Sequence, residues 1–78
     1  MKTKRDRDNF LVRQGRLLRR ARKERGLTLL AVTKAIGKSR TWLSDIEAGR
    51  NDIYFVDITK LADLYGADVN EWAKELKE

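Results

Sequence analysis

The side chains of this 78-residue sequence that could take part in chemistry are mostly cations. The chain has 18 Lys and Arg against 12 Asp and Glu, which gives a formal net charge of +6. It contains no His and no Cys, so the usual general base, disulfides and thiolate zinc sites are excluded. Asp45 and Glu47 are two residues apart in a helical segment and point to different faces, a poor arrangement for acid–base catalysis. We therefore expect no enzyme, with no catalytic residue, no metal and no cofactor.

The cations are concentrated at the N-terminal end of the chain. Residues 1–26 carry eleven basic groups and three carboxylates, whereas residues 51–78 carry three Lys and seven carboxylates. Such a charge distribution favours binding of a polyanion such as nucleic acid to the basic side of the molecule, while the acidic side stays free of it. The same pattern also fits a solvated basic face that only keeps the protein soluble, so charge alone leaves both interpretations open.

Length and hydropathy predict one small domain outside the membrane. Hydrophobic residues make up 41% of the chain, enough for a compact core. No apolar run approaches the ~20 residues that span a bilayer, and the N-terminal segment has no signal-peptide pattern. We expect a cytoplasmic protein without a membrane partner.

Apolar spacing and glycine positions predict an all-α chain. No segment alternates with a period of two, and the sequence has no Pro. Four glycines, Gly26, Gly37, Gly49 and Gly66, each follow a segment with helical apolar spacing, where helices commonly end. The predicted helices cover residues 8–25, 29–36, 40–48, 54–65 and 69–77. Their predicted N-caps include Asp8, Thr28, Ser39 and Asp68.

Gly15 lies inside the first predicted helix, at a cost of ~1 kcal/mol relative to Ala. Either another part of the backbone approaches closely at this position, or the glycine is simply tolerated.

Residues 28–48 are predicted to be two short helices separated by a glycine turn. This spacing matches the helix-turn-helix of DNA-binding proteins, whose second helix enters the major groove, although any pair of short helices has the same outline. More specific motifs are Gly15-x-x-Leu18-Arg19-x-x-Arg22, Gly26-Leu27-Thr28, Gly37-x-Ser39-Arg40, Leu43-Ser44-x-Ile46-Glu47-x-Gly49-Arg50 and Leu61-Ala62-x-x-Tyr65-Gly66. Because these five motifs occur together and in this order, the chain from about residue 15 to residue 73 resembles the Cro/cI-type (XRE-like) helix-turn-helix family of phage repressors and related bacterial regulators.

The resemblance implies a compact five-helix, lambda-repressor-like domain over residues 8–78, preceded by a flexible basic arm over residues 1–7. It also implies a sequence-specific double-stranded DNA-binding regulator of transcription, expected to be a repressor. Such a regulator would act as a homodimer on a pseudo-palindromic operator, with helix 40–48 in the major groove. The alternative is an antitoxin or protein-interaction module of the same fold, with a toxin or another protein bound on helices 54–78.

Base reading is expected from four residues near the start of the recognition helix if the family's docking applies. Arg40 would read a guanine or hold a phosphate. Thr41 would contact a base edge or only support the helix start. Asp45 would accept from a cytosine, orient Arg40 or discourage wrong sites by repulsion. Trp42 would pack at the edge of the DNA groove, or cover the seam between its helix and the preceding one.

Contacts to the DNA backbone are expected from helix N-termini and polar side chains. The predicted set is Thr28, Leu29, Lys38, Ser39, Ser44, Arg50, Asn51, Arg16 and Arg20. Leu29 and Lys38 depart from the family pattern, which often has Gln and a small apolar residue there. The resemblance assigns Arg22 and Glu47 a structural role, as a partly buried ion pair between the first and third helices. The arm 1–7 would lie along the DNA or only keep the protein soluble.

One domain of this kind reads only a few base pairs, so specific binding usually needs two copies. Residues 53–78 must then supply the dimer surface. The predicted interface consists of Trp72, Ala73 and Leu76, with Tyr54 and Val56 as further members.

Overall fold

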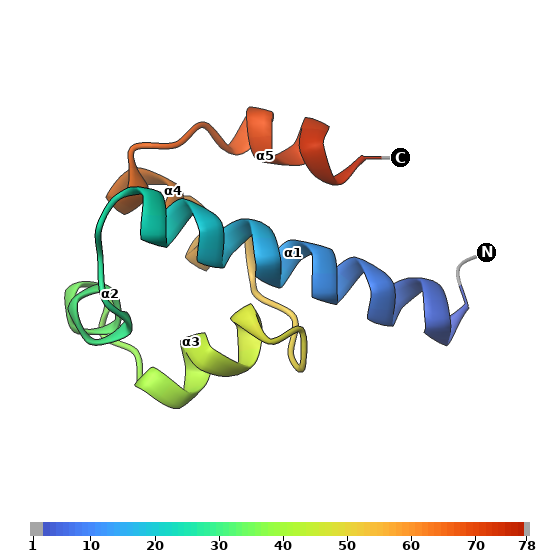
Figure 1. Cartoon of the computed structure of the whole chain (residues 1–78), viewed down its shortest axis with the longest axis horizontal. Coiled ribbons are helices and arrows are strands. Elements are labelled where there is room, and N and C mark those ends of the chain that lie inside the picture. Colours follow the sequence, from blue (N-terminus) through green and yellow to red (C-terminus); the bar gives the residue numbers. More distant parts are fainter. Residues whose placement is uncertain (1–2, 78) are drawn as a thin grey trace.

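Five α-helices and no strand make up the part of the chain that the computed structural model describes, residues 3–77. They are α1 (Lys4–Glu24), α2 (Leu29–Ile36), α3 (Arg40–Glu47), α4 (Phe55–Tyr65) and α5 (Val69–Leu76). The predicted all-α fold is therefore confirmed. The long helix α1 crosses the middle of the molecule, with α5 on one side of it and α2 and α3 on the other (Figure 1). None of the described helices is long and apolar enough to cross a membrane.

Helix α1 begins earlier than the sequence predicted, at Lys4 instead of near Asp8. Thr3 is its N-cap, and the Thr3 hydroxyl accepts a hydrogen bond from the Asp6 N–H at 3.2 Å. The Asp6 carboxylate in turn accepts from the Thr3 N–H at 3.2 Å, which completes a capping box. Residues 4–7 of the predicted arm thus form the first turn of α1. Residues 1 and 2 of that arm and residue 78 of the predicted domain lie outside the described residues.

The other helix ends are close to the prediction. The side chains of Thr28, Ser39 and Asp68 accept backbone N–H groups as the N-caps of α2, α3 and α5. Tyr54 precedes α4 and makes no side-chain capping hydrogen bond. Helices α3 and α5 end one residue before their predicted ends, and α4 begins one residue later than predicted.

The core is formed by apolar side chains from all five helices. Its most deeply buried members are Leu18, Val32, Leu43, Ile46 and Leu61. Trp72 closes the core from α5, with its ring centroid 6.3 Å from that of Tyr65. Only 8% of Trp72 is exposed, so most of its ring belongs to the core of the single chain, and its place in a dimer interface stays a prediction. Burial raises the pKa of the Tyr65 hydroxyl.

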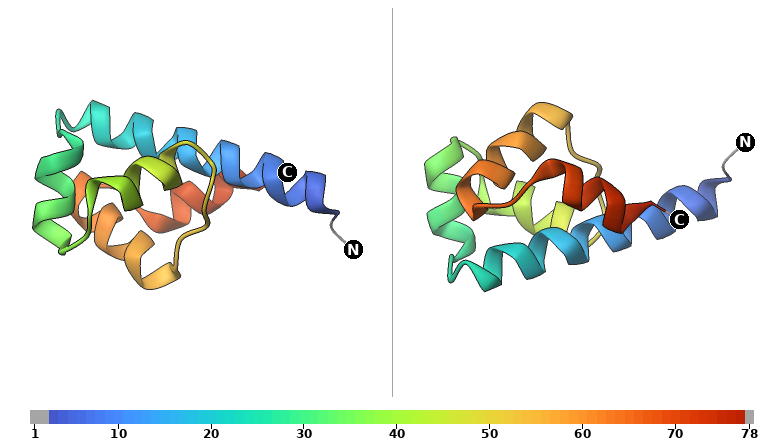
Figure 2. Two further views of the ribbon diagram at one scale, coloured as in Figure 1. Left: turned by 90° about the horizontal axis from the view of Figure 1, so that it is seen from below. Right: turned by 90° about the horizontal axis from the view of Figure 1, so that it is seen from above.

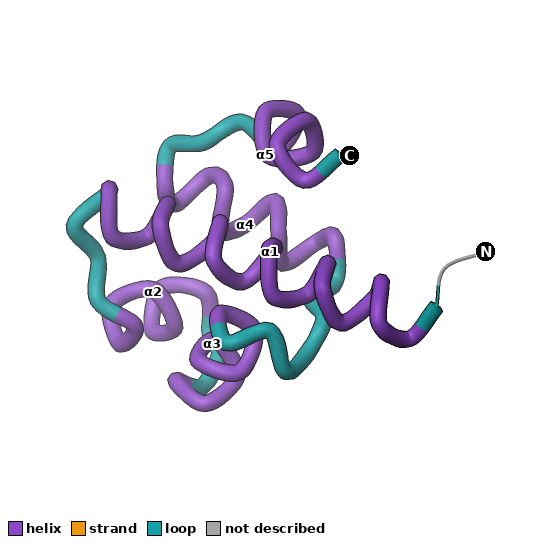
Figure 3. Tube along the Cα trace, turned by 45° about the vertical axis from the view of Figure 1, so that its right-hand side comes forward, coloured by secondary structure: helices purple, strands orange, loops and turns teal. Residues whose placement is uncertain are grey.

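Gly15 lies where α1 meets the C-terminal end of α3. A Cβ atom built at this glycine would lie 2.5 Å from the carbonyl oxygens of both Ile46 and Glu47. Of the two explanations for a glycine at position 15, the close approach of another backbone segment is therefore the correct one. The missing side chain lets α3 pack directly on α1, as the two helices do in Figure 3.

An ion pair beside Gly15 holds the same two helices together. Arg22 of α1 donates from Nε to Oε2 of Glu47 at 2.7 Å and from Nη2 to Oε1 at 3.0 Å. Its third group, Nη1, donates to the Leu27 carbonyl at 2.8 Å. The hydrogen bonds to Glu47 raise the pKa of Arg22 against the opposing effect of burial. The pair that the resemblance implied is thus present, and it fixes the orientation of α3 against α1.

Candidate nucleic-acid interface

Helices α2 and α3 form a helix-turn-helix. Gly37 ends α2 in the left-handed region, with φ of 73°, where glycine has no Cβ penalty. The chain then turns into α3, where the Ser39 hydroxyl accepts from the Trp42 N–H at 3.1 Å. Leu43 and Ile46 on the inner face of α3 are buried. Arg40 and Thr41 at the start of α3 are exposed.

The start of α3 presents two unoccupied polar side chains. Arg40 and Thr41 are both exposed, and neither side chain makes a hydrogen bond or ion pair within residues 3–77. Asp45, one turn later, accepts from Nε of Arg50 at 3.0 Å. The Asp45 carboxylate is therefore paired with Arg50, and it does not orient Arg40 in this structure.

Trp42 is half-buried and packs against the core. The Nζ of Lys38 lies 5.2 Å from the centroid of the Trp42 ring, within range of a cation–π interaction. The same Nζ lies 3.7 Å from Oδ2 of Asp57, a buried residue in the first turn of α4. Lys38 thus connects the turn of the helix-turn-helix to α4. The geometry of Trp42 agrees with the interpretation in which it covers a seam between helices.

An open hollow next to the start of α3 gathers cations from two helices. It has a volume of about 670 Å³ and lies between the C-terminal half of α1, the N-terminal end of α2 and Arg40. Arg19 and Lys23 of α1 line it together with Arg40, and all three are exposed. Thr28, the N-cap of α2, also lines it. We call this site the basic hollow. Cations around a helix N-terminus attract a phosphate, because the N–H groups and the helix dipole favour negative charge.

Two predicted DNA-backbone contacts, Arg16 and Arg20, lie on the side of α1 that faces α5. Arg20 forms an ion pair with Glu75 of α5, and Arg16 lines a small hollow with the same carboxylate. Helix α5 lies across α1 from α3 (Figure 1). Arg16 and Arg20 therefore lie on the side of α1 away from α3, and their role as DNA contacts stays a prediction.

Sequence reasoning missed Arg19 and Lys23. A signal for them was present, since Arg22 was expected to reach Glu47 on the third helix. Arg19 lies three residues before Arg22 and Lys23 lies four residues after Arg19, which are the spacings of neighbours on a helix face, whereas Arg20 is only two residues from Arg22.

The remaining predicted backbone contacts surround the helix-turn-helix. The hydroxyls of Thr28 and Ser39 are used as caps, and the Leu29 side chain packs on the core, so these positions offer backbone N–H groups. Ser44 is half-buried, while Arg50 and Asn51 are exposed after α3. The left view of Figure 2 places α3 in front, with α1 and α4 on either side of it.

The predicted dimer residues other than Trp72 are accessible. Tyr54 and Val56 are 81% and 57% exposed, Ala73 is exposed, and Leu76 is half-buried.

Comparison with known proteins gives two findings. Residues 14–74 match the model of a family described as a helix-turn-helix domain. The chain is also similar to the ImmF control region 10 kDa protein of Bacillus phage phi105, with 41% identity over 56 residues. The matched segment is 72% of this chain and 62% of that phage protein, so the chain spans less than two thirds of the length of this relative.

Proposed function

Because the chain belongs to the helix-turn-helix domain family of DNA-binding proteins, we propose that it is a sequence-specific regulator of transcription. In this proposal it acts as a repressor and binds a pseudo-palindromic operator as a homodimer. The observation that carries the proposal is the basic hollow, which adjoins the exposed start of α3. The similarity to a protein named for a phage control region supports a regulatory role.

In the proposed complex, α3 enters the major groove with Arg40 and Thr41 nearest the bases. A guanidinium group can donate two hydrogen bonds to the O6 and N7 atoms of guanine, the commonest specific contact. Thr41 offers a methyl and a hydroxyl to the neighbouring base. The two residues are suited to this because nothing in residues 3–77 occupies their polar atoms.

The DNA backbone would pass over the basic hollow. A phosphate there meets the N-terminal N–H groups of α2 and the cations Arg19 and Lys23. Such contacts fix the register of the protein on the duplex but carry no sequence information. They therefore complement the reading of bases by the start of α3.

The proposal is tested by incubating purified protein with random-sequence duplexes, followed by sequencing of the retained DNA at two salt concentrations. We expect enrichment of an inverted repeat whose half-sites are about one helical turn apart. Retention without enrichment would contradict sequence-specific regulation. No retention even at low salt would contradict DNA binding and favour a protein partner on helices α4 and α5.

The first variant to compare is Arg40→Ala. We expect it to relax the preference at one position of each half-site, at a cost of about 1–3 kcal/mol for the best sequence. The selection is repeated with the variant, and the two base-frequency profiles are compared. If every position kept its preference, Arg40 would contact a phosphate or nothing, and its role as a base reader would be wrong.

The basic hollow is tested by comparing Arg19→Ala with Arg20→Ala. Both variants remove one positive charge from adjacent positions, but only Arg19 lines the hollow. We expect Arg19→Ala to weaken binding to all sequences equally and to reduce the slope of log K against log salt by about 0.9. Arg20→Ala should leave the slope nearly unchanged. Equal effects in a filter-binding titration would mean that affinity follows net charge and that the hollow has no special role.

A further inference from the structure

The recognition helix α3 is anchored at its C-terminal end by contacts with α1. Glu47, the last residue of the helix, pairs with Arg22, and the backbone there lies directly against Gly15. Arg40 and Thr41 lie at the opposite end of α3, about 10 Å away by the rise of a helix. The direction of the N-terminal turn of α3 therefore depends on other contacts.

Lys38 supplies such a contact from the turn before α3. Its backbone N–H donates to the Thr33 carbonyl at 2.9 Å, which fixes the Lys38 backbone just after the end of α2. Its Nζ lies 3.7 Å from Oδ2 of Asp57 and 5.2 Å from the centroid of the Trp42 ring. Trp42 is in the first turn of α3, together with Arg40. One ammonium group thus connects the start of α3 to the start of α4.

The Asp57 carboxylate is a buried partner for this ammonium group. The Asp57 side chain is only 5% exposed, and within residues 3–77 Lys38 is its only ion-pair partner. Asp57 lies in the first turn of α4, where the helix dipole also favours a negative charge. Because a buried carboxylate without a counter-ion is costly, Asp57 holds Lys38 in place.

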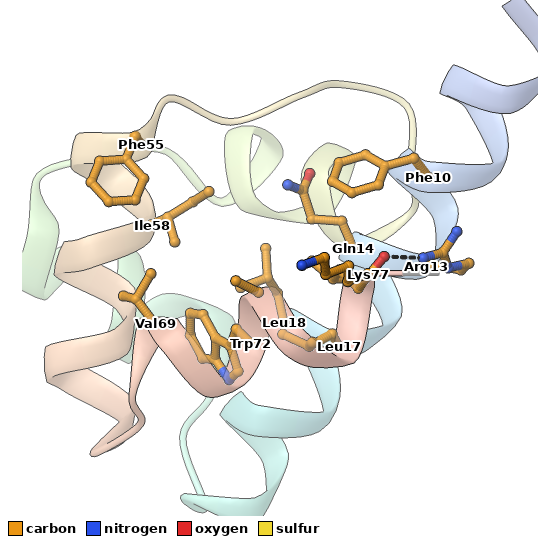
Figure 4. Close-up of a pocket in the computed structure, with 12 residues that line it drawn as sticks. Phe10, Arg13, Gln14, Leu17, Leu18, Phe55, Ile58, Val69, Trp72 and Lys77 are labelled. Carbon is orange, nitrogen blue, oxygen red and sulfur yellow. Dashed lines mark hydrogen bonds between the residues drawn. The ribbon is translucent and has the colours of Figure 1, made fainter. Parts of the chain in front are cut away.

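The helix that carries Asp57 is packed against the rest of the molecule. Leu61 and Ala62 of α4 are buried in the core. Figure 4 shows Ile58 of α4 and Val69 of α5 in the wall of an apolar groove of about 660 Å³ between α1, α4 and α5. The start of α4 is therefore fixed by the fold, and a side chain paired with Asp57 is fixed with it.

We propose that Lys38 is a positioning residue for DNA recognition. Its ammonium group is held between Asp57 and the Trp42 ring, and this fixes the first turn of α3. The directions of Arg40 and Thr41, in the same turn, are fixed with it. This role differs from the predicted contact with a DNA phosphate, for which the ammonium group would leave Asp57. The inference rests on the proposed function and names a residue that acts on specificity without touching a base.

Lys38→Met tests this role in titrations with two duplexes, the best one from the selection above and an unrelated one. The variant keeps an unbranched side chain and removes the charge. We expect the ratio of the two affinities to fall about tenfold, at the low end of what one good base contact contributes, while the slope of log K against log salt stays unchanged. A phosphate contact would instead weaken binding to both duplexes equally and reduce the slope by about 0.9, and this result would overturn the proposal.

Asp57→Asn separates positioning from simple electrostatics. The variant removes a negative charge, so electrostatic attraction alone would tighten its binding to DNA. If Asp57 holds Lys38 in place, the affinity ratio should instead fall about as much as in Lys38→Met. The double variant should lower the ratio no further, because both residues act through one contact. Tighter binding by Asp57→Asn, or an unchanged affinity ratio, would overturn the proposal.

Thermal melting without DNA tests the contact itself and gives the temperature below which each variant is folded for the titrations. The fall in Tm of the double variant should be smaller than the sum of the two single falls. The matched control is Lys34→Met, which removes the same charge from an exposed lysine of α2. Its fall should add to that of Asp57→Asn, and it should leave the affinity ratio unchanged. Additive falls for Lys38 and Asp57 would overturn the proposal.

The two proposals fail in different ways. If the wild-type chain retained no duplex, the proposed function and this role of Lys38 would both be wrong. If the wild-type chain enriched a sequence and Lys38→Met reduced the salt slope, only the role of Lys38 would be wrong.

Discussion

Replacing Gly15 with alanine is expected to lower the free energy of unfolding by about 3 kcal/mol, because the new methyl group would overlap the backbone of α3. In an ordinary helix interior the same change stabilises by ~1 kcal/mol. Here the Cβ would lie 2.5 Å from two carbonyl oxygens. Backbone atoms cannot rotate away as a side chain would, so α1 and α3 must separate.

Thermal or urea denaturation followed by circular dichroism measures this effect. A loss of 3 kcal/mol corresponds to a fall in Tm of about 12–24 °C for a domain of this size. Asn9→Ala is a suitable control, because Asn9 is an exposed residue of the same helix and should change stability little. A Gly15→Ala protein as stable as the wild type would mean that α3 does not pack on α1 as closely as described.

Replacing Glu47 with alanine is expected to destabilise the protein by about 3–5 kcal/mol, since it leaves a buried guanidinium group without its counter-ion. The side chains of Arg22 and Glu47 are only 8% and 6% exposed. Arg22 cannot escape the penalty by losing its proton, because an arginine stays charged at any pH at which the protein is folded.

The control for Glu47→Ala is another ion pair on the same helix. Asp45→Ala breaks the bond to Arg50, whose side chain is 63% exposed, and should cost less than about 1 kcal/mol. The double variant Arg22→Met, Glu47→Leu removes both charges and should recover much of the loss. If Glu47→Ala and Asp45→Ala had equal midpoints in urea, the buried pair would not hold α1 to α3.

The sequence was most informative where glycines and caps mark helix ends. Thr28, Ser39 and Asp68 were predicted as N-caps and act as such. The start of α1 was missed because residues 4–9 have no apolar periodicity to reveal a helix. The signal was only the Thr3–Asp6 capping box, a local polar pattern that many loops share.

Side-chain direction was harder to predict than helix position. Arg16 and Arg20 were chosen from a basic face of the first helix, but the neighbours of that face depend on how α5 folds back over α1. Trp72 was assigned to an interface from its apolar stripe, and the sequence did not reveal how much of its ring packs in the core of the single chain. Both cases depend on contacts between residues far apart in the sequence, such as Arg20 and Glu75, which the local sequence pattern does not specify.

The two faces of α3 consist of separate residues. Leu43, Ile46 and Glu47 hold the helix in place, whereas Arg40 and Thr41 are exposed and take no part in that packing. Mutations at the two outer positions therefore leave the scaffold undisturbed. In the proposed complex, descendants of this chain would acquire new target preferences by changes at positions 40 and 41, while they inherit the same packing of α1 against α3.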